Sequence, residues 1–368
     1  MIRSALALAL CLPCAIASAA AAAGERRLTF GGFGTLGALY HDAEGLEYRR
    51  SSNQPHGAEA DKVDLAVDSL LGAQINAAWS QSLEVVAQGL TRLTADNDWQ
   101  PQLTRGFLRY SPNATVELRT GRIGWEIYPR ADSRDIGYAN LRIRPEPEVF
   151  GFVPTDHFDG ADLYLQRPLG AGVASLKLFG GAAGGKIARA NGSINEIDGS
   201  KVWGGRVEYA TGPWILRLGS GVFQLDDTPQ LDALVAGLRQ TGQPQALALA
   251  DTFASGERRV LFYVAAAAYD EGPLQGRIFY GRTESSDGVA TPKVNTGLIT
   301  GGYGIGPFTP YATLAYIDSY NQPRGTGLPD TAQFAALNAG AAAAQAITQN
   351  NQSALTLGVR YYVRPKVA

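Results

Sequence analysis

The sequence predicts an all-β fold, a transmembrane antiparallel β-barrel with fourteen visible strands. Three observations lead to this prediction. Apolar and polar residues alternate in segments of about ten residues, which is typical of strands with one face in lipid and the other in water. The connections between these segments alternate between short and long, as barrels of bacterial outer membranes require. The N-terminus carries an export signal.

The first 23 residues have the three parts of a secretory signal peptide. Arg3 supplies a positive charge, residues 5–16 are almost wholly apolar, and small residues occupy 18–23. The apolar stretch is well short of the roughly 20 residues that a helix needs to span a bilayer. We therefore expect residues 1–23 to be a cleaved leader and residues 24–368 to form a single barrel domain. Both cysteines, Cys11 and Cys14, fall within the leader.

The strand pattern recurs in fourteen segments of the mature chain. Leu71, Ala73 and Ile75 share one face of residues 71–79, for example, and their neighbours point the other way. The segments are residues 28–40, 71–79, 82–92, 103–111, 114–124, 159–168, 172–181, 201–211, 213–224, 258–270, 272–284, 292–304, 307–318 and 353–364.

The connections predict which ends of the strands face the periplasm. The short ones lie at 80–81, 111–114, 167–170, 211–213, 271–273 and 305–307, and five of these six contain proline, which suits a tight turn. The long ones, predicted to be external, are 41–61, 93–103, 125–158, 182–200, 225–257, 285–291 and 319–352. Residues 230–250, around a Gly-Gln-Pro break, and the Ala-rich residues 331–348 are predicted to be helical, because long loops without structure of their own are uncommon. We expect these helices to cover the barrel mouth or to pack against a neighbouring loop.

Aromatic residues gather at strand ends, where rings with a polar tip suit the headgroup boundary of a bilayer. They are Tyr40, Trp79, Tyr110, Trp203, Tyr209, Trp214, Tyr269, Tyr280 and Tyr316. We interpret them as girdle anchors.

Four stretches of the chain resemble the porins of Gram-negative outer membranes: FGGFGTLGALY (30–40), LRTGRIGWEIYPRADSRDIGYANLRIRPEPEVFG (118–151), GPFTPYATLAYID (306–318) and SALTLGVRYY (353–362). The resemblance covers nearly the whole mature chain. It implies an outer-membrane location, a homotrimer of barrels in contact with outer-membrane lipid, and a third external loop folded into each pore. It also implies sixteen strands.

The end of the sequence departs from the family pattern. Porins finish on a strand that ends in an aromatic residue, whereas this sequence continues through Arg364-Pro365-Lys366, which resembles another periplasmic turn, to Val367 and Ala368. One interpretation is a chain truncated at its C-terminus, with two of sixteen strands missing. The other is a complete fourteen-stranded barrel closed by residues 353–363.

The third loop has the charges that a pore constriction requires, since opposing charges across a pore orient polar solutes and set ion preference. The candidate constriction residues are Arg122, Glu126, Arg130, Asp132, Arg134, Asp135, Arg142, Arg144, Glu146 and Glu148. The alternation also turns basic residues toward the lumen, namely Arg105, Arg109, Arg119, Lys177, Arg206, Arg217, Arg277 and Arg360. Fewer acids, Glu84, Glu117, Asp162 and Glu208, share that face, which predicts a weak anion preference. The alternative is a solvated loop whose charges pair with one another.

The leading functional hypothesis is passive diffusion of small polar or ionic solutes through a water-filled pore, without a cofactor. Catalysis and metal binding are not expected, because His41, His56 and His157 are scattered and the mature chain has no cysteine. The balance of 32 basic and 34 acidic residues argues against nucleic acid as a partner. An adhesin or structural barrel that acts through its long external loops remains the alternative.

Overall fold

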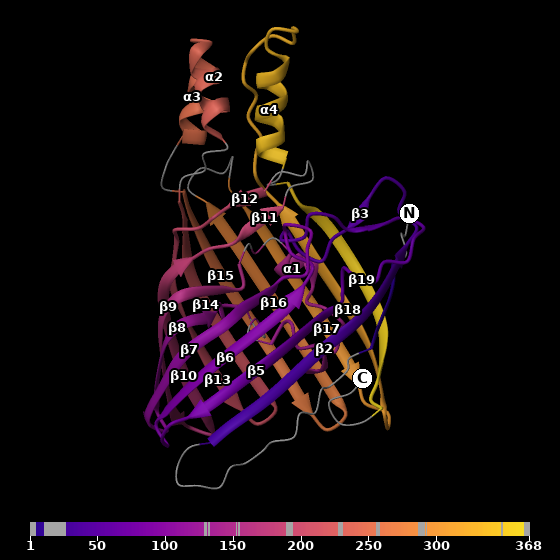
Figure 1. The fold of residues 1–368 in the computed structure, drawn as a ribbon, viewed down its shortest axis with the longest axis vertical. Helices are drawn as coiled ribbons and strands as arrows, with labels where there is room; N and C mark the ends of the chain where they lie inside the picture. The colour runs from indigo at the N-terminus through magenta and orange to yellow at the C-terminus, as the bar shows by residue number, and fades with distance from the viewer. Residues whose placement is uncertain are drawn as a thin grey trace.

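Antiparallel strands that follow one another along the chain make up the fold (Figure 1). The computed structural model describes residues 5–10, 27–128, 131, 133–151, 153, 155–188, 194–226, 231–254, 258–285, 291, 293–346 and 349–363. The main sheet comprises β1 (Ala5–Leu10), β2 (Arg27–His41), β5 (Leu70–Ala78), β6 (Leu83–Arg92), β7 (Pro101–Asn113), β8 (Val116–Gly124), β9 (His157–Leu169), β10 (Gly172–Ala183), β13 (Ser200–Thr211), β14 (Trp214–Leu225), β15 (Arg258–Glu271), β16 (Leu274–Ser285), β17 (Val294–Tyr303), β18 (Phe308–Ser319) and β19 (Asn351–Tyr361).

Every one of the fourteen predicted strand segments is a strand of this sheet, from β2 to β19. The sheet also contains β1, which lies within the predicted leader and pairs with the second half of β2, from Leu10 opposite Leu36 to Ala5 opposite His41. The order of the strands in the sheet follows the chain, so β1 and β19 are its two edges.

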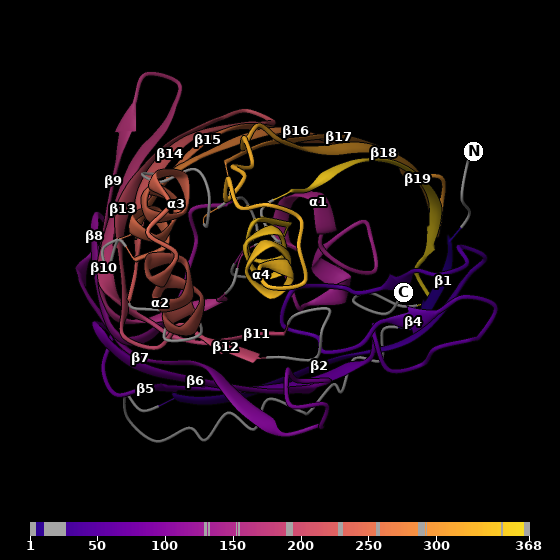
Figure 2. The same cartoon turned by 90° about the horizontal axis from the view of Figure 1, so that it is seen from above.

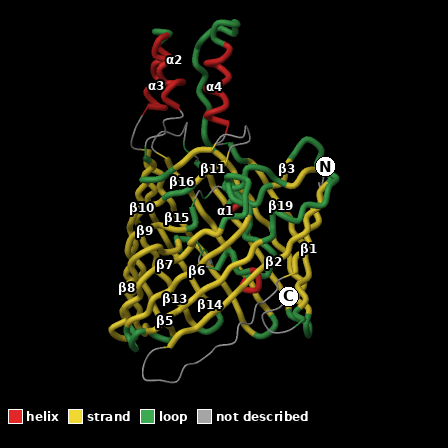
Figure 3. The backbone as a smooth tube through the Cα atoms, viewed as in Figure 1, coloured by secondary structure: helices red, strands yellow, loops and turns green. Residues whose placement is uncertain are grey.

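The predicted short connections form tight turns at one end of the sheet. Gly170, Gly212, Gly272 and Gly306 have φ between 51° and 58°, in the left-handed region that glycine adopts without a steric penalty. In three of these turns proline follows the glycine, and the strand resumes directly afterwards. The long connections, as far as the structure describes them, leave the strands at the opposite end (Figure 3).

The two faces of the sheet differ in burial, as the alternation predicts. We call the face that carries buried side chains such as Phe223 and Phe279 the inner face, and the opposite one the outer face. On β14 and β19 the outer face presents Leu218 and Leu357, which are 60% and 73% exposed. Seen from above, the sheet curves into a ring, and its inner face surrounds the loops (Figure 2).

The principal core lies inside this ring. It joins inner-face residues of β6–β10 and β13–β18 to the connection between β8 and β9, which contains the 3₁₀-helix η1 (Gly137–Ala139) and the short helix α1 (Pro147–Phe150). Because an aqueous lumen needs no such core, its presence means that this connection fills part of the interior. Two small sheets, β3 (Glu47–Tyr48) with β4 (Ala58–Glu59) and β11 (Lys186–Ala188) with β12 (Ile194–Glu196), lie among the other long connections.

Three helices stand beyond the strand ends, as predicted: α2 (Asp232–Gln240), α3 (Pro244–Ala254) and α4 (Ala335–Ala346) (Figure 1). The predicted Gly-Gln-Pro break separates α2 from α3. The helices share a second core, in which Leu238 and Leu249 are almost wholly buried. A Cβ on Gly237 of α2 would lie 2.6 Å from Leu337 of α4, so the two long loops meet closely at that glycine. Of the helices described, none has the length and apolarity to cross a membrane.

Candidate functional site

The third loop, residues 125–156, crosses from β8 and β9 to strands that are remote in the sheet order. Thr296 of β17 donates a 2.7 Å hydrogen bond to the backbone oxygen of Glu148. Gln352 of β19 donates one of 2.7 Å to the Glu148 carboxylate, and Arg360 donates one of 2.7 Å to the backbone oxygen of Gly137. These bonds hold the loop against the inner face of β17–β19, inside the ring (Figure 2).

An aromatic cluster fixes the start of the loop to the inner face. The ring of Trp125 lies 5.7 Å from that of Phe223 and 5.2 Å from that of Phe262, and Tyr128 lies 5.7 Å from Phe279. Each such pair adds about 0.5–1.5 kcal/mol beyond the apolar area that it buries. The loop is therefore anchored on β14–β16, and its charged side chains lie elsewhere.

A first charged cluster, which we call the strand network, runs along the inner face of β6–β14. Arg119 donates a 2.9 Å hydrogen bond from Nε to Asp162 and a 2.8 Å one from Nη2 to Glu126. Lys177 donates a 2.5 Å hydrogen bond to the same glutamate. Burial raises the pKa of Glu126, but Lys177 and Arg119 outweigh it and hold that pKa well below its ordinary range. The network continues through further ion pairs: Arg206–Glu208, Arg217–Glu208, Arg109–Glu84 and Arg109–Glu117. Among these described residues five basic side chains meet five acidic ones, so the strand network is electrically balanced.

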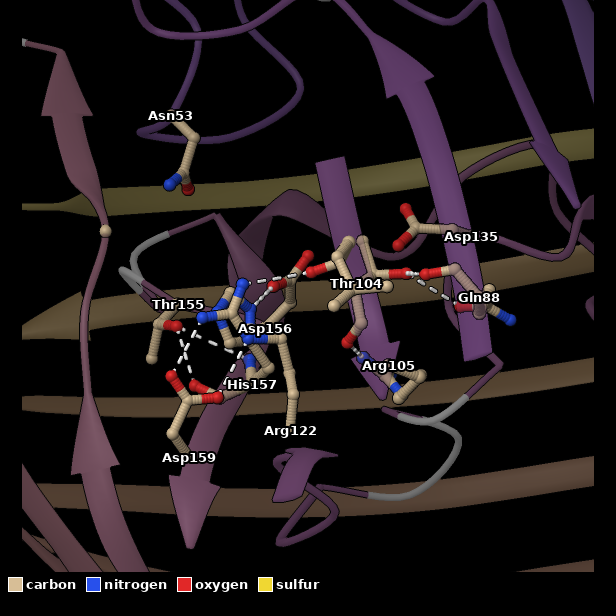
Figure 4. Close-up of polar contacts among 12 residues, drawn as sticks. Asn53, Gln88, Thr104, Arg105, Arg122, Asp135, Thr155, Asp156, His157 and Asp159 are labelled. Carbon is tan, nitrogen blue, oxygen red and sulfur yellow. Dashed lines mark hydrogen bonds and ion pairs between the residues drawn. The ribbon is translucent and has the colours of Figure 1, made fainter. Parts of the chain in front are cut away.

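A second charged cluster, the loop cluster, surrounds Asp135 and Asp156. Arg92 of β6 binds Asp135 and Asp156, each at 3.0 Å. Arg134 lies 3.2 Å from Asp156, and Arg50, from the first long connection, pairs with Asp135. Asp156 also contacts Nδ1 of His157 at 2.6 Å (Figure 4).

Electrostatics keep both aspartates of the loop cluster ionised. Burial alone would raise the pKa of Asp156, but the hydrogen bond to His157 and the charges of Arg134 and Arg92 hold it well below its ordinary value. Burial likewise raises the pKa of Asp135, and Arg92, Arg50 and Arg134 lower it by more. The two carboxylates therefore remain negative at neutral pH.

Among the side chains that the structure describes, the loop cluster holds more arginines than aspartates. Arg105 of β7 is buried close enough to feel the charges of Asp156, Arg134 and Asp135. With Arg50, Arg92 and Arg134, it brings four arginines to two aspartates among the residues described here. Glu126 also acts on Arg105, and Asp68 also acts on Arg50, so acids of the neighbouring clusters contribute to the electrostatics of the loop cluster.

A third charged cluster lies between the third loop and the first long connection. Arg144 pairs with Asp68 and stacks on the ring of Tyr48, whose centroid is 4.4 Å away. Nη1 of Arg142 lies 3.6 Å from Oε1 of Glu146, four residues farther along the chain. This cluster joins the third loop to the first long connection.

The candidate constriction residues therefore separate into groups. Glu126 belongs to the strand network, Arg134 and Asp135 to the loop cluster, and Arg142, Arg144 and Glu146 to the third cluster, while Glu148 reaches Gln352. Arg130 and Asp132 lie outside the described residues.

Arg122 requires a correction. It lies within β8 on the outer face, where it binds Asp159 at 2.8 Å, because Arg119 and Ile123 of the same strand point inward and side chains alternate. Its partner is Asp159 rather than an aspartate of the loop cluster, although the charge of Asp156 also acts on it.

The eight basic residues predicted to line a lumen all lie on the inner face. Seven share the alternation of a buried neighbour such as Phe107, Phe179 or Phe279, and Arg360 alternates with the exposed Leu357 and Val359. The eight are Arg105, Arg109, Arg119, Lys177, Arg206, Arg217, Arg277 and Arg360. Glu126, which reaches the strands from the loop, reduces the expected excess of base over acid by one charge.

The sequence prediction missed Arg50, Arg92, Asp68 and Asp156. Arg92 shares the alternation of Val86 and Leu90, which are buried on β6, so the strand pattern could have identified it. Arg50 and Asp68 lie in the first long connection, where no periodic signal places a side chain. Within the described part of the chain, no three metal-ligating side chains come together.

Known proteins give a comparison for this arrangement. No protein-family model matches the chain, and no curated protein matches it in sequence. Among solved structures, Salmonella typhi OmpF in complex with daunomycin has a TM-score of 0.54 at 11% identity, over 93% of this chain and 87% of that chain.

Two further solved structures are similar at lower TM-scores. They are the anion-selective porin from Comamonas acidovorans (TM-score 0.38, 11% identity, 97% and 99% of the two chains) and the outer-membrane channel DcaP of Acinetobacter baumannii (0.42, 11%, 92% and 98%). The likeness to OmpF confirms the predicted resemblance at the level of the fold: this chain has the fold of an outer-membrane porin.

Proposed function

We propose that the chain is an outer-membrane porin, through which small polar or charged solutes diffuse passively. In this proposal the sheet is a transmembrane barrel, residues 1–23 are a cleaved leader, and the protein is a homotrimer in contact with outer-membrane lipid. The observation that carries the proposal is the third loop, which is anchored on one side of the ring by aromatic rings and presents buried charges on the other.

The exposed apolar residues of the outer face support the proposal that this sheet lies in a bilayer. Leu314, Leu355 and Leu357 are 59%, 64% and 73% exposed, on neighbouring strands with no described element covering them. Contiguous apolar surface of this kind is rare on soluble proteins and marks contact with a membrane or a partner. We favour contact with lipid over contact with a partner protein, because strands that span a bilayer turn apolar residues outward.

The charges of the interior support selection among ions. A solute that passes the third loop would meet the loop cluster, where, among the residues that the structure describes, four arginines (Arg50, Arg92, Arg105 and Arg134) surround two aspartates. Rings of basic side chains favour anions in pores. We therefore propose that the loop cluster is the constriction, that the strand network lines the pore beyond it, and that the pore prefers anions weakly.

Single-channel recording tests this function. The refolded full chain is added to a planar bilayer under a salt gradient, and circular dichroism confirms its β-structure beforehand. We expect stepwise conductance, in groups of three for a trimer, and a reversal potential of the sign that anion preference gives. Folded protein that never conducts would contradict the proposal.

A matched pair of variants tests the site. Arg92→Gln removes one positive charge from the loop cluster, whereas Arg122→Gln removes the same charge from the outer face. We expect the reversal potential to shift toward cations in Arg92→Gln and to stay unchanged in Arg122→Gln. Equal shifts in the two variants would place the selective site elsewhere.

A further inference from the structure

The outer face of β9–β16 carries a groove of about 850 Å³, most of whose lining residues point away from the ring. The strand register arranges the outward side chains in two rows of directly opposed residues. One row is Arg167, Ala174, Tyr209, Leu216, Ala267 and Ile278, and the other is Leu165, Leu176, Val207, Leu218, Ala265 and Tyr280. Alanines form the floor of the groove, and exposed leucines form its walls.

The first row runs obliquely from the turns toward the middle of the strands. Arg167 lies three residues before the turn glycine Gly170, whereas Ala267 lies five residues before the corresponding Gly272. Because a strand rises about 3.4 Å per residue, the row lies about 7 Å farther along the strand at Ala267 than at Arg167. The charged end of the groove is therefore close to the turns, at the level of Trp214 and Tyr269, and the apolar end is deeper.

We propose that this groove binds one glycerophospholipid of the periplasmic leaflet, with the phosphate on Arg167 and an acyl chain along the two rows. This inference rests on the proposed membrane location. Arg167 is exposed on the outer face, and among the described residues it forms no ion pair, so its charge is available to an anionic headgroup. Arginine is well suited to phosphate because its guanidinium donates two parallel hydrogen bonds.

The length of the groove fits an acyl chain. Six strands set about 4.8 Å apart give a row of about 24 Å. One leaflet of a hydrocarbon core about 30 Å thick is about 15 Å deep. A row that shifts by about 7 Å along the strands therefore stays within one leaflet. The alanine floor leaves room for the chain, because the residues opposite Ala265 and Ala267 on the two neighbouring strands are leucine, isoleucine or tyrosine.

Native mass spectrometry of the refolded full chain tests the proposal, with phosphatidylglycerol as the probe in detergent. We expect one retained lipid per chain. Ala267→Leu fills the groove and should abolish retention, whereas Ala312→Leu, the same change on the outer face of β18, should not.

A second set of variants tests the proposed contact between the lipid phosphate and Arg167. Arg167→Gln should weaken retention about tenfold or more, because hydrogen bonds to charged groups contribute at least that factor. Arg167→Lys should weaken it less. Lys201→Gln removes an exposed charge at the other end of β13 and should have no effect.

Two outcomes would overturn the inference. Equal retention in Ala267→Leu, Ala312→Leu and the unmodified chain would show that the groove holds no specific lipid. If light scattering shows that Ala267→Leu changes the oligomeric state while its lipid retention equals that of the unmodified chain, this face would be assigned to a second copy of the protein. Conductance in planar bilayers separates these failures from failure of the pore itself, since none of these variants alters the inner face.

Discussion

Replacing Glu126 with Gln should destabilise the barrel although the change is nearly isosteric. Glu126 accepts hydrogen bonds from Lys177 at 2.5 Å and Arg119 at 2.8 Å, and Arg206 lies 3.6 Å away. The side chains of Glu126, Lys177 and Arg119 are only 13%, 6% and 9% exposed, so water compensates them poorly.

The expected cost of Glu126→Gln follows from these contacts. Hydrogen bonds to a charged group contribute about 1.5–3 kcal/mol each, against about 1 kcal/mol for neutral ones, so two bonds lose about 2 kcal/mol. Leaving buried cations without their partner costs about 3–5 kcal/mol when no other carboxylate compensates. Asp162 stays within 3.5 Å of Lys177 and still binds Arg119, so we expect a loss of about 2–4 kcal/mol in the free energy of unfolding.

Denaturant unfolding in lipid vesicles, followed by tryptophan fluorescence, measures this cost. Asp96→Asn is the control, because the Asp96–Lys186 pair is 44% and 41% exposed and should contribute at most about 1 kcal/mol. The double variant Glu126→Gln with Lys177→Met should recover part of the loss, since it removes the cation that lacks a partner. If Glu126→Gln costs no more than Asp96→Asn, the buried network does not stabilise the fold as argued.

Three more variants probe other parts of the molecule. Trp125→Ala should cost about 3–5 kcal/mol of unfolding free energy and make the single-channel current noisier, because the third loop loses its aromatic anchor, whereas the exposed Trp99→Ala should change neither. The depressed pKa of Asp156 means that its contribution to stability is present above its unfolded pKa of about 3.9 and is lost as pH falls through the folded value. An acid titration followed by circular dichroism should therefore show a steeper loss in the unmodified chain than in Asp156→Asn, and equal slopes would contradict this. Gly237→Leu should clash with Leu337 and open the helical cap to limited proteolysis without lowering the melting temperature of the barrel; an unchanged digestion pattern would count against the packing of α2 on α4.

The strands were predictable because their signal is local. Alternation of side chains fixes which face Arg119 and Arg206 take, and glycines such as Gly170 and Gly272 mark turns wherever the chain needs a left-handed residue. The cap helices were predictable for a similar reason, since the Gly-Gln-Pro break and the alanine-rich run act within a few residues.

The grouping of charges was not predictable from the same patterns. Arg122 and Arg134 are close in sequence and both basic, yet one lies on the outer face of β8 and the other in the loop cluster. Arg50 and Asp135 are 85 positions apart, and nothing local to either indicates their pairing. Such pairs depend on the path of the third loop across the ring, which is set by the packing of Trp125 and its neighbours.

The sequence by itself determined the strands, their order, their inner and outer faces and the likeness to porins, because these follow from period-two alternation and from turn residues. Only the tertiary structure decided which charges meet. Glu126 completes the strand network from a loop, and four arginines from four different segments surround two aspartates. The physical reason is that ion pairing depends on distance through space, and the loop that sets those distances is positioned by apolar packing against strands far from it in the chain.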